Sequence, residues 1–166
     1  MLVRRETPAD VGPIDHVHRQ AFPGPVEADL VHALRADAGW VPALSLLAED
    51  AGGRVTGHVV CTLASVGSVP VVGLGPIGVL PDVQRTGVGS ALMHAVIAAA
   101  DALDHPLVAL LGHLDYYPKF GFVPASTLGV LAPDARWGDH FQARPLATWH
   151  DGLRGPFRYA APFEAL

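Results

Sequence analysis

Hydrophobic residues recur along this chain at two different spacings, and the alternation between them predicts its elements. Leu30, Val31 and Leu34 share one face of a helix, whereas the apolar run 43–48 has the length and composition of a buried strand. Helices are expected at 7–21, 26–37 and 87–103, with a short helix or turn at 116–120. Strands are expected at 2–6, 43–49, 54–63, 69–79 and 106–111, at one beginning near 122, and at 140–146.

Capping and turn residues mark where these elements begin. Thr7 is suited to cap the first helix, with Pro8 at its first position and Asp10 three residues after the cap. The turn Asp50-Ala51-Gly52-Gly53 predicts a hairpin between the second and third strands.

The remaining segments carry weaker patterns. Residues 124–140 are expected to form a loop, and the aromatic tail from Trp149 has no pattern that assigns it a structure. A chain of 166 residues, half of them apolar, is long enough to bury one independent core. We therefore predict a single mixed α/β domain over residues 1–166, with helices flanking a mixed central sheet of about six to seven strands.

The net charge of the chain limits the classes of molecule that it is expected to bind. Eleven basic and sixteen acidic side chains give a net charge of −5, and no run of basic residues occurs. Nucleic-acid binding is therefore not supported, because it depends on clustered positive charge. The negative balance is compatible with a cationic amine as substrate.

One uncharged segment has to be weighed against a membrane span. Residues 59–81 carry no formal charge and are long enough to cross a bilayer. Seven glycine and proline residues interrupt the segment, so two buried strands joined by a turn are expected instead, and no membrane partner. Cys61 is the only cysteine, and its apolar neighbours predict a buried thiol without a disulfide. With no signal peptide at the N-terminus, we expect a soluble protein of the reducing cytoplasm.

The segment after the strand 71–79 is suited to bind an anion. It contains Arg85, Gly87 and Gly89 and leads at once into the helix that ends near residue 103. The first N–H groups of a helix have no partner within it, and the helix dipole favours negative charge there. Glycine removes side chains that would keep a phosphate away.

Two other phosphate motifs do not apply. No lysine follows the glycines, so the loop is not that of nucleoside-triphosphate hydrolases. A formal Gly-x-Gly-x-x-Gly occurs at Gly73, Gly75 and Gly78, but it lies inside the strand and Pro76 interrupts it. These residues are expected to mark a bulge that splays the strand.

Two blocks of sequence carry a resemblance to a known family. The first is Gln84-x-x-Gly87-x-Gly89, after a strand that ends Ile77-Gly78-Val79-Leu80-Pro81. The second is Leu110-Leu111-Gly112 followed by Tyr116-Tyr117-Pro118-Lys119-Phe120-Gly121-Phe122. In this order, the blocks resemble the acetyl-CoA and tyrosine motifs of the GNAT superfamily of N-acetyltransferases. The second block and the aromatic tail are most similar to bacterial predicted N-acetyltransferases of the YhbS type.

The resemblance implies a GNAT fold with acetyl-CoA as co-substrate. In such folds the fourth and fifth strands splay apart, and the pantetheine arm lies between them. Backbone contacts to the arm are implied for Ile77, Gly78 and Val79, with the Val79 N–H also acting as an oxyanion contact. The loop residues implied to hold the pyrophosphate are Gln84, Arg85, Thr86, Gly87, Val88, Gly89 and Ser90.

Tyr117 matches the family's general acid, which protonates the departing CoA thiolate, and it is also expected to contact the cofactor. A phenol with a pKa of about 10 suits a thiolate whose conjugate acid has a pKa of about 8.5. The amine attacks the thioester directly in a ternary complex, so Cys61 has no catalytic role. Tyr116 is expected only to pack.

The general base is left open by the sequence. Relatives often carry a glutamate on the fourth strand, but residues 69–81 contain no titratable side chain, and Leu110 replaces an asparagine that relatives often carry. Glu27, His58 and His113 are the candidates. A water chain, or an amine that arrives neutral, are the alternatives.

The absent glutamate also leaves a rival function open, a GNAT-fold module that binds acyl-CoA as a sensor without turnover. The histidines are too scattered to predict a metal site. The sequence does not decide whether the amine belongs to a small molecule or a peptide, or whether the acyl group is acetyl or longer. The resemblance allows a homodimer.

Overall fold

The computed structural model describes all 166 residues and contains nine strands, three α-helices and six short 3-10 helices. The strands are β1 (Leu2–Arg5), β2 (Trp40–Glu49), β3 (Val55–Val66), β4 (Val69–Val79), β5 (Leu107–Leu111), β6 (Val123–Pro124), β7 (Val130–Leu131), β8 (Phe141–Pro145) and β9 (Gly155–Arg158). The helices are α1 (Val11–Ala21), α2 (Val26–Arg35) and α3 (Val88–Ala102). The 3-10 helices are η1 (Pro8–Asp10), η2 (Pro81–Val83), η3 (Tyr117–Phe120), η4 (Ala125–Leu128), η5 (Ala135–His140) and η6 (Ala161–Ala165).

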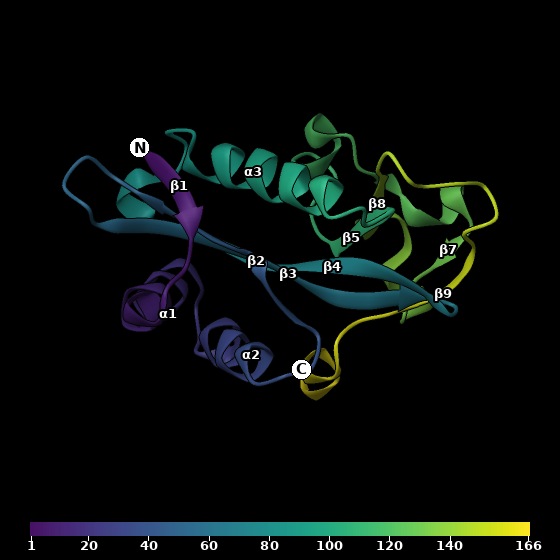
Figure 1. The fold of residues 1–166 in the computed structure, drawn as a ribbon, viewed down its shortest axis with the longest axis horizontal. Coiled ribbons are helices and arrows are strands. Elements are labelled where there is room, and N and C mark those ends of the chain that lie inside the picture. Colours follow the sequence, from purple (N-terminus) through teal and green to yellow (C-terminus); the bar gives the residue numbers. More distant parts are fainter.

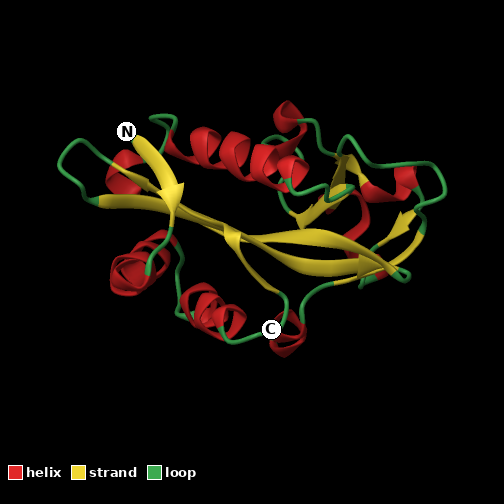
Figure 2. Ribbon diagram, viewed as in Figure 1, coloured by secondary structure: helices red, strands yellow, loops and turns green.

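The sheet separates two helical layers (Figures 1 and 2). Helix α3 covers one face, while α1 and α2 lie on the other, with the C-terminal end of the chain beside α2. The strand order is β1-β2-β3-β4-β5-β8-β6, and β9 pairs with both β3 and β7. None of the helices has both the length and the apolar character needed to cross a membrane.

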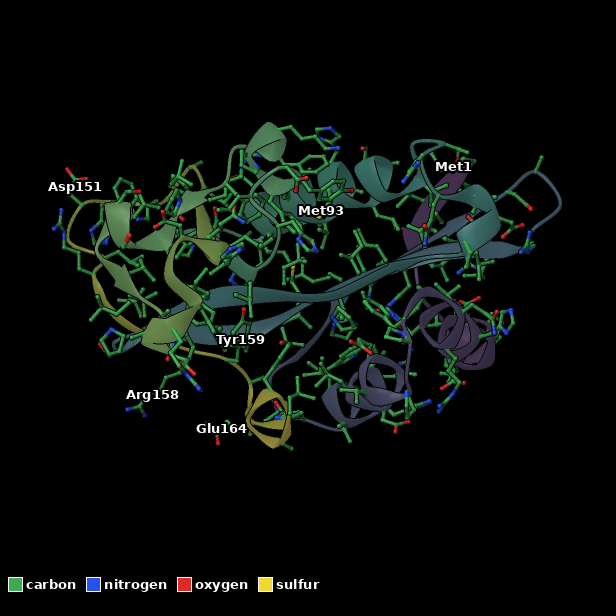
Figure 3. All side chains as sticks on the ribbon, turned by 180° about the vertical axis from the view of Figure 1, so that it is seen from behind. Met1, Met93, Asp151, Arg158, Tyr159 and Glu164 are labelled. Atoms are coloured by element: carbon green, nitrogen blue, oxygen red, sulfur yellow. The ribbon has the colours of Figure 1, made fainter.

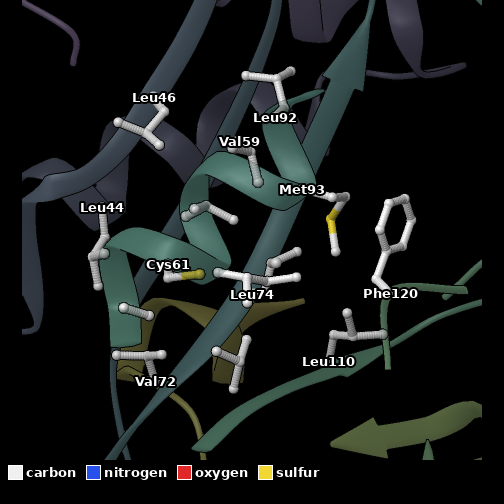
Figure 4. Close-up of a cluster of buried hydrophobic side chains, with 14 of the residues drawn as sticks. Leu44, Leu46, Val59, Cys61, Val72, Leu74, Leu92, Met93, Leu110 and Phe120 are labelled. Atoms are coloured by element: carbon white, nitrogen blue, oxygen red, sulfur yellow. The ribbon is translucent and has the colours of Figure 1, made fainter. Parts of the chain in front are cut away.

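The largest core cluster lies between α3 and the sheet (Figure 4). The apolar stripe of α3 buries Leu92 and Val96 completely, against Val59 and Cys61 of β3. Each buried side chain of this size stabilises the fold by about 1.5–3 kcal/mol relative to exposure. A second cluster joins α1 and α2 to the opposite face of the sheet, and a third packs β9 against β5 and β8. The sheet is therefore packed against apolar side chains on both faces.

The fourth and fifth strands separate at the centre of the sheet, as expected. They run parallel, and only two residues of β4, Val72 and Gly73, pair with β5. On the other edge of β4, the register with β3 shifts between Val59 and Cys61, where Gly75 and Pro76 make the bulge that the glycines predicted. From Leu74 onward, β4 has no strand partner on its β5 side.

Three expectations need correction. The sheet has nine strands rather than six to seven, because β7 and β9 were not expected, whereas the strand expected near residue 122 is β6. The expected loop 124–140 contains two 3-10 helices and β7, and the unassigned tail supplies β9 and η6. These elements are too short for hydrophobic spacing to identify, and their pairing partners lie far away in the chain. At the N-terminus, the residues after Thr7 form the 3-10 helix η1 before α1 begins at Val11.

Candidate functional site

Six successive backbone N–H groups are free at the start of α3. None of the N–H groups from Arg85 to Ser90 donates to an acceptor in the protein; the next one, of Ala91, donates to the Gly87 carbonyl at 3.0 Å. The first turn of the helix contains no acidic side chain. Free N–H groups at the positive end of a fifteen-residue helix favour an anion.

Left-handed backbone shapes this loop. Arg85 has φ 63° and Gly87 has φ 99°. Gly87 is needed for its φ, since a side chain there would meet nothing within 4 Å. Gly89 is needed for a different reason, because a Cβ at this position would come within 2.9 Å of the Tyr116 hydroxyl. Burial raises the pKa of Tyr116, and its hydrogen bond with Ser90 opposes the rise. Tyr116 therefore supports the start of α3 as well as packing, a role that the sequence did not suggest.

The open edge of β4 presents the backbone of Ile77 and Val79. The N–H of Leu80 donates to Thr56 on β3, and Gly78 stands opposite His58 on the same strand. Since successive residues of a strand direct their backbone groups to alternate edges, those of Ile77 and Val79 face the gap toward β5. The Gln84 side chain reaches this edge and donates from Nε2 to the Val79 carbonyl at 3.1 Å.

The gap opens on a cavity of about 900 Å³ on the α2 side of the sheet. Its lining comes from the diverging strands, from α2, and from the C-terminal tail. Of the residues expected in the site, Ile77, Tyr117, Glu27 and His113 line this cavity, and so does Leu110.

Tyr117 projects from the turn after β5 into this cavity. Its ring lies against Gly112, where a Cβ would come within 2.1 Å of the ring atom Cε2. The ring of Tyr116 is edge-on to it at 5.0 Å, and that of Phe122 at 6.0 Å. Burial raises the pKa of Tyr117 to about 12, and Tyr116 adds to the shift. The phenol therefore carries its proton at neutral pH, as a general acid must.

His58 lies apart from the cavity, fully buried in a series of hydrogen-bonded polar side chains between α1 and the sheet. Its Nδ1 is 2.8 Å from His18 Nε2, and its Nε2 is 2.9 Å from Ser45 Oγ. Ser45 in turn donates to Glu6 at 2.6 Å. These contacts engage both ring nitrogens of His58. Of the three candidate bases, only Glu27 and His113 reach the cavity.

Each glycine of the Gly73-x-Gly75-x-x-Gly78 stretch lies under a ring from another part of the chain. A Cβ at Gly73 would come within 2.7 Å of Tyr159, one at Gly75 within 3.6 Å of Phe163, and one at Gly78 within 2.9 Å of His18. Gly78 thus makes room for His18 and turns its backbone to β3. The tail residues Tyr159 and Phe163 were missed by the sequence analysis; their only signal was the aromatic composition of the tail.

Comparison with known proteins decides the family. The family model for the acetyltransferase (GNAT) domain matches residues 42–124. The uncharacterized N-acetyltransferase YjhQ of Escherichia coli strain K12 is 38% identical over 164 residues, which cover 94% of this chain and 90% of YjhQ. The chain belongs to the GNAT family of acetyltransferases.

Solved structures of GNAT proteins share this fold. Escherichia coli YhbS in complex with CoA has a TM-score of 0.89 and 29% identity, over 98% of this chain and 91% of YhbS. A GNAT family acetyltransferase from Brucella melitensis in complex with acetyl-CoA has a TM-score of 0.79 and 30% identity, over 98% of this chain and 97% of its own. The resemblance to GNAT proteins of the YhbS type, and the fold that it implied, are confirmed.

The GNAT site has no arrangement suited to a metal ion. No group of three or more histidine, cysteine, aspartate or glutamate side chains lies close enough together to hold one. Cys61 is buried in the core against α3, away from the cavity, and burial raises the pKa of its thiol. Of the groups expected to act at the site, the structure places the backbone N–H groups, the Tyr117 phenol, and the side chains of Glu27 and His113 there.

Proposed function

We propose that this GNAT protein is an acetyl-CoA-dependent N-acetyltransferase that transfers acetyl to an amine in a ternary complex. The observation that carries the proposal is the continuity of two unpaired backbone surfaces. Six free N–H groups suited to a pyrophosphate lie next to a strand edge suited to an extended amide chain. CoA has both parts, a pyrophosphate and a pantetheine arm with two amides. CoA and acetyl-CoA are also the molecules bound to the two solved relatives.

The anion loop before α3 and the open edge of β4 bind different parts of acetyl-CoA. The pyrophosphate is held by the loop from Gln84 to Ser90, through its N–H groups and the exposed guanidinium of Arg85. The arm is held by backbone groups of Ile77 and Val79. The Val79 N–H is aimed into the gap, where it stabilises negative charge that develops on the thioester oxygen. Gly78 is the least supported of the cofactor contacts, since its backbone faces β3.

Tyr117 is assigned the role of general acid. When the amine nitrogen bonds to the acetyl carbon, the C–S bond breaks and the CoA thiolate leaves. The Tyr117 hydroxyl then gives its proton to the sulfur. Its raised pKa keeps the proton available over the physiological range, and a positioned acid contributes about 10²–10⁴-fold to rate.

The proton that the amine loses goes to Glu27 or His113. Both line the cavity, and the side chain of neither forms a hydrogen bond or ion pair with another residue. Glu27 is half-buried on α2, whereas His113 is exposed after β5. A proton from solvent returns the Tyr117 phenolate to the phenol, so that amine and acetyl-CoA end as amide and CoA thiol. An acceptor that enters as an ammonium loses one further proton to solvent before the attack.

A thiol-release assay with acetyl-CoA and a panel of amines tests this function. We expect turnover with at least one amine, and a loss of about 10²-fold or more in kcat for Tyr117→Phe with acetyl-CoA binding retained. Binding of acetyl-CoA without turnover on any amine would instead favour the rival function, a sensor of acyl-CoA. The absence of a titratable side chain on β4 is the feature that this rival explains.

A further inference from the structure

We propose that the acceptor is a primary amine carried on a flat aromatic body that bears no carboxylate. This inference rests on the proposed function and concerns the part of the cavity farthest from the anion loop. Two features of that part carry it: an aromatic wall built largely by the tail, and the half-buried carboxylate of Glu27, which has no side-chain partner.

The wall begins with Tyr159 and Phe163, whose rings stack at 4.4 Å between centroids with 28° between their planes. They lie directly on the β4 backbone, because Gly73 and Gly75 have no side chains to hold them away. Trp137 continues the wall at 6.5 Å from Tyr159. Figure 3 shows Tyr159 where the tail passes beside the sheet, with Arg158 and Glu164 toward the outside. Phe163 and Trp137 are only half-buried, so this surface offers ring contact to a flat aromatic ligand.

The charge of the cavity comes mainly from carboxylates. Asp134 is engaged by the exposed guanidinium of Arg136, and Glu164 is exposed at the rim. Arg158 is the one guanidinium of the lining, and it is exposed on the outer side, where solvent screens it from a ligand bound at Glu27. Glu27 is the half-buried carboxylate of the lining, and it makes no hydrogen bond or ion pair with another side chain. An ammonium group would satisfy Glu27, whereas a carboxylate on the acceptor would be repelled by it.

Other classes of amine fit this lining less well. A polyamine needs a series of acceptors along its length, and here one half-buried carboxylate is free. A peptide would bring backbone N–H and C=O groups against a wall of ring carbons, and each polar group left without a partner is costly. An arylalkylamine needs one anion and one apolar face, which the cavity supplies.

The test compares amines that differ by one feature. With saturating acetyl-CoA, kcat/KM is measured for 2-phenylethylamine, 2-cyclohexylethylamine, phenylalanine and spermidine. We expect 2-phenylethylamine to exceed 2-cyclohexylethylamine by about 3- to 10-fold, since only its ring is flat. We expect it to exceed phenylalanine and spermidine by about 10-fold or more. Equal or better use of phenylalanine or spermidine would overturn the inference.

Calorimetric binding of the amines separates this inference from the proposed function, because it requires no turnover. If acetyl-CoA fails to bind, the proposed function fails, and the order of amine affinities still tests the acceptor class. If acetyl-CoA binds but 2-phenylethylamine binds no better than spermidine, the acceptor class is wrong and the function stands.

Two variants locate the recognition. Glu27→Gln is expected to weaken the binding of 2-phenylethylamine by about 10-fold, through loss of a charge-assisted contact. Asp29→Asn, on the same helix but paired with Arg19 at the surface, is the control and should leave it unchanged. Phe163→Leu should reduce the ratio of kcat/KM for 2-phenylethylamine to that for 2-cyclohexylethylamine. Loss of affinity in Asp29→Asn equal to that in Glu27→Gln would contradict the assignment.

Discussion

The side-chain amide of Gln84 donates to the carbonyl oxygen of Val79 across 3.1 Å, and this contact ties the anion loop to the open edge of β4. The two surfaces assigned to acetyl-CoA are therefore not independent. The loop is positioned against the strand whose backbone faces the gap. A change at Gln84 is expected to act on cofactor binding without touching the core, because its side chain is exposed.

Replacing Gln84 tests this connection. Gln84→Ala removes one hydrogen bond, whose net contribution is about 0.5–1.5 kcal/mol, so we expect the Kd for acetyl-CoA to rise by about 2- to 10-fold. Gln20→Ala, at an exposed glutamine of α1, is the control. Calorimetric titration measures both. An unchanged Kd in Gln84→Ala would show that the contact does not organise the loop.

Gly112 is predicted to be required for the position of Tyr117. An alanine Cβ at 112 would lie 2.1 Å from the Tyr117 ring, which must then leave its place. We expect Gly112→Ala to lower kcat by as much as Tyr117→Phe, with a cost to stability of about 1–3 kcal/mol from overpacking. Gly12→Ala, in open space on α1, is the control.

A double variant makes this prediction sharper. In Tyr117→Phe, the acid is already absent, so adding Gly112→Ala should lower kcat little further. If the two losses multiply instead, Gly112 affects turnover through something other than Tyr117.

The buried His18–His58 pair is predicted to make stability depend on pH. Burial lowers the pKa of His18 to about 3, and burial also lowers the pKa of His58, an effect that Glu6 opposes and Arg35 reinforces. Both rings stay neutral in the native state, while the unfolded chain binds a proton at each below a pKa of about 6.5. The two neutral histidines thus contribute fully to the free energy of unfolding above that pH, and this contribution is lost as the pH falls.

Urea unfolding at two pH values measures this effect. Between pH of about 7.5 and about 5.5, the two histidines are expected to lower the free energy of unfolding by roughly 2–3 kcal/mol. His18→Gln should reduce this dependence on pH, whereas the exposed His16→Gln should not. A free energy of unfolding that does not change over this range would contradict the neutral assignment.

Cys61 is predicted to be chemically silent. Its thiol is fully buried, and burial raises its pKa, so the reactive thiolate is absent from the native state. We expect a thiol reagent to modify Cys61 at the rate at which the native core opens, faster in added urea. Turnover should persist in Cys61→Ala, measured by thiol release at a temperature where the variant is folded. Accumulation of an acetyl group on Cys61 would contradict direct attack by the amine.

The sequence predicted the parts of the site that depend on local backbone. The loop from Gln84 to Ser90 could be located because a strand, glycines and a long helix follow one another in the chain. The bulge at Gly75 and Pro76 could be located because these residues interrupt a strand. The Tyr117 turn was found by its motif, and family membership then confirmed the fold.

The acceptor side could not be predicted in the same way. Tyr159 and Phe163 reach β4 from more than eighty residues away, and nothing local marks where they pack. The rings explain why β4 carries glycines at Gly73 and Gly75, yet the glycines alone do not reveal which side chains cover them. The 3-10 helices and two-residue strands of 123–140 are likewise held by tertiary contacts, since segments this short are not stable by themselves.

The central claim is that the free N–H groups from Arg85 to Ser90 hold the pyrophosphate of acetyl-CoA. The most direct measurement is a titration of the ¹⁵N-labelled protein with acetyl-CoA, following the backbone amide resonances by NMR. We predict that the amide protons of this loop shift together toward lower field as they gain an acceptor, at the concentrations that saturate binding, and that the Ile77 and Val79 amides shift with them. Saturation by acetyl-CoA with the loop amides unmoved, or no binding, would contradict the account.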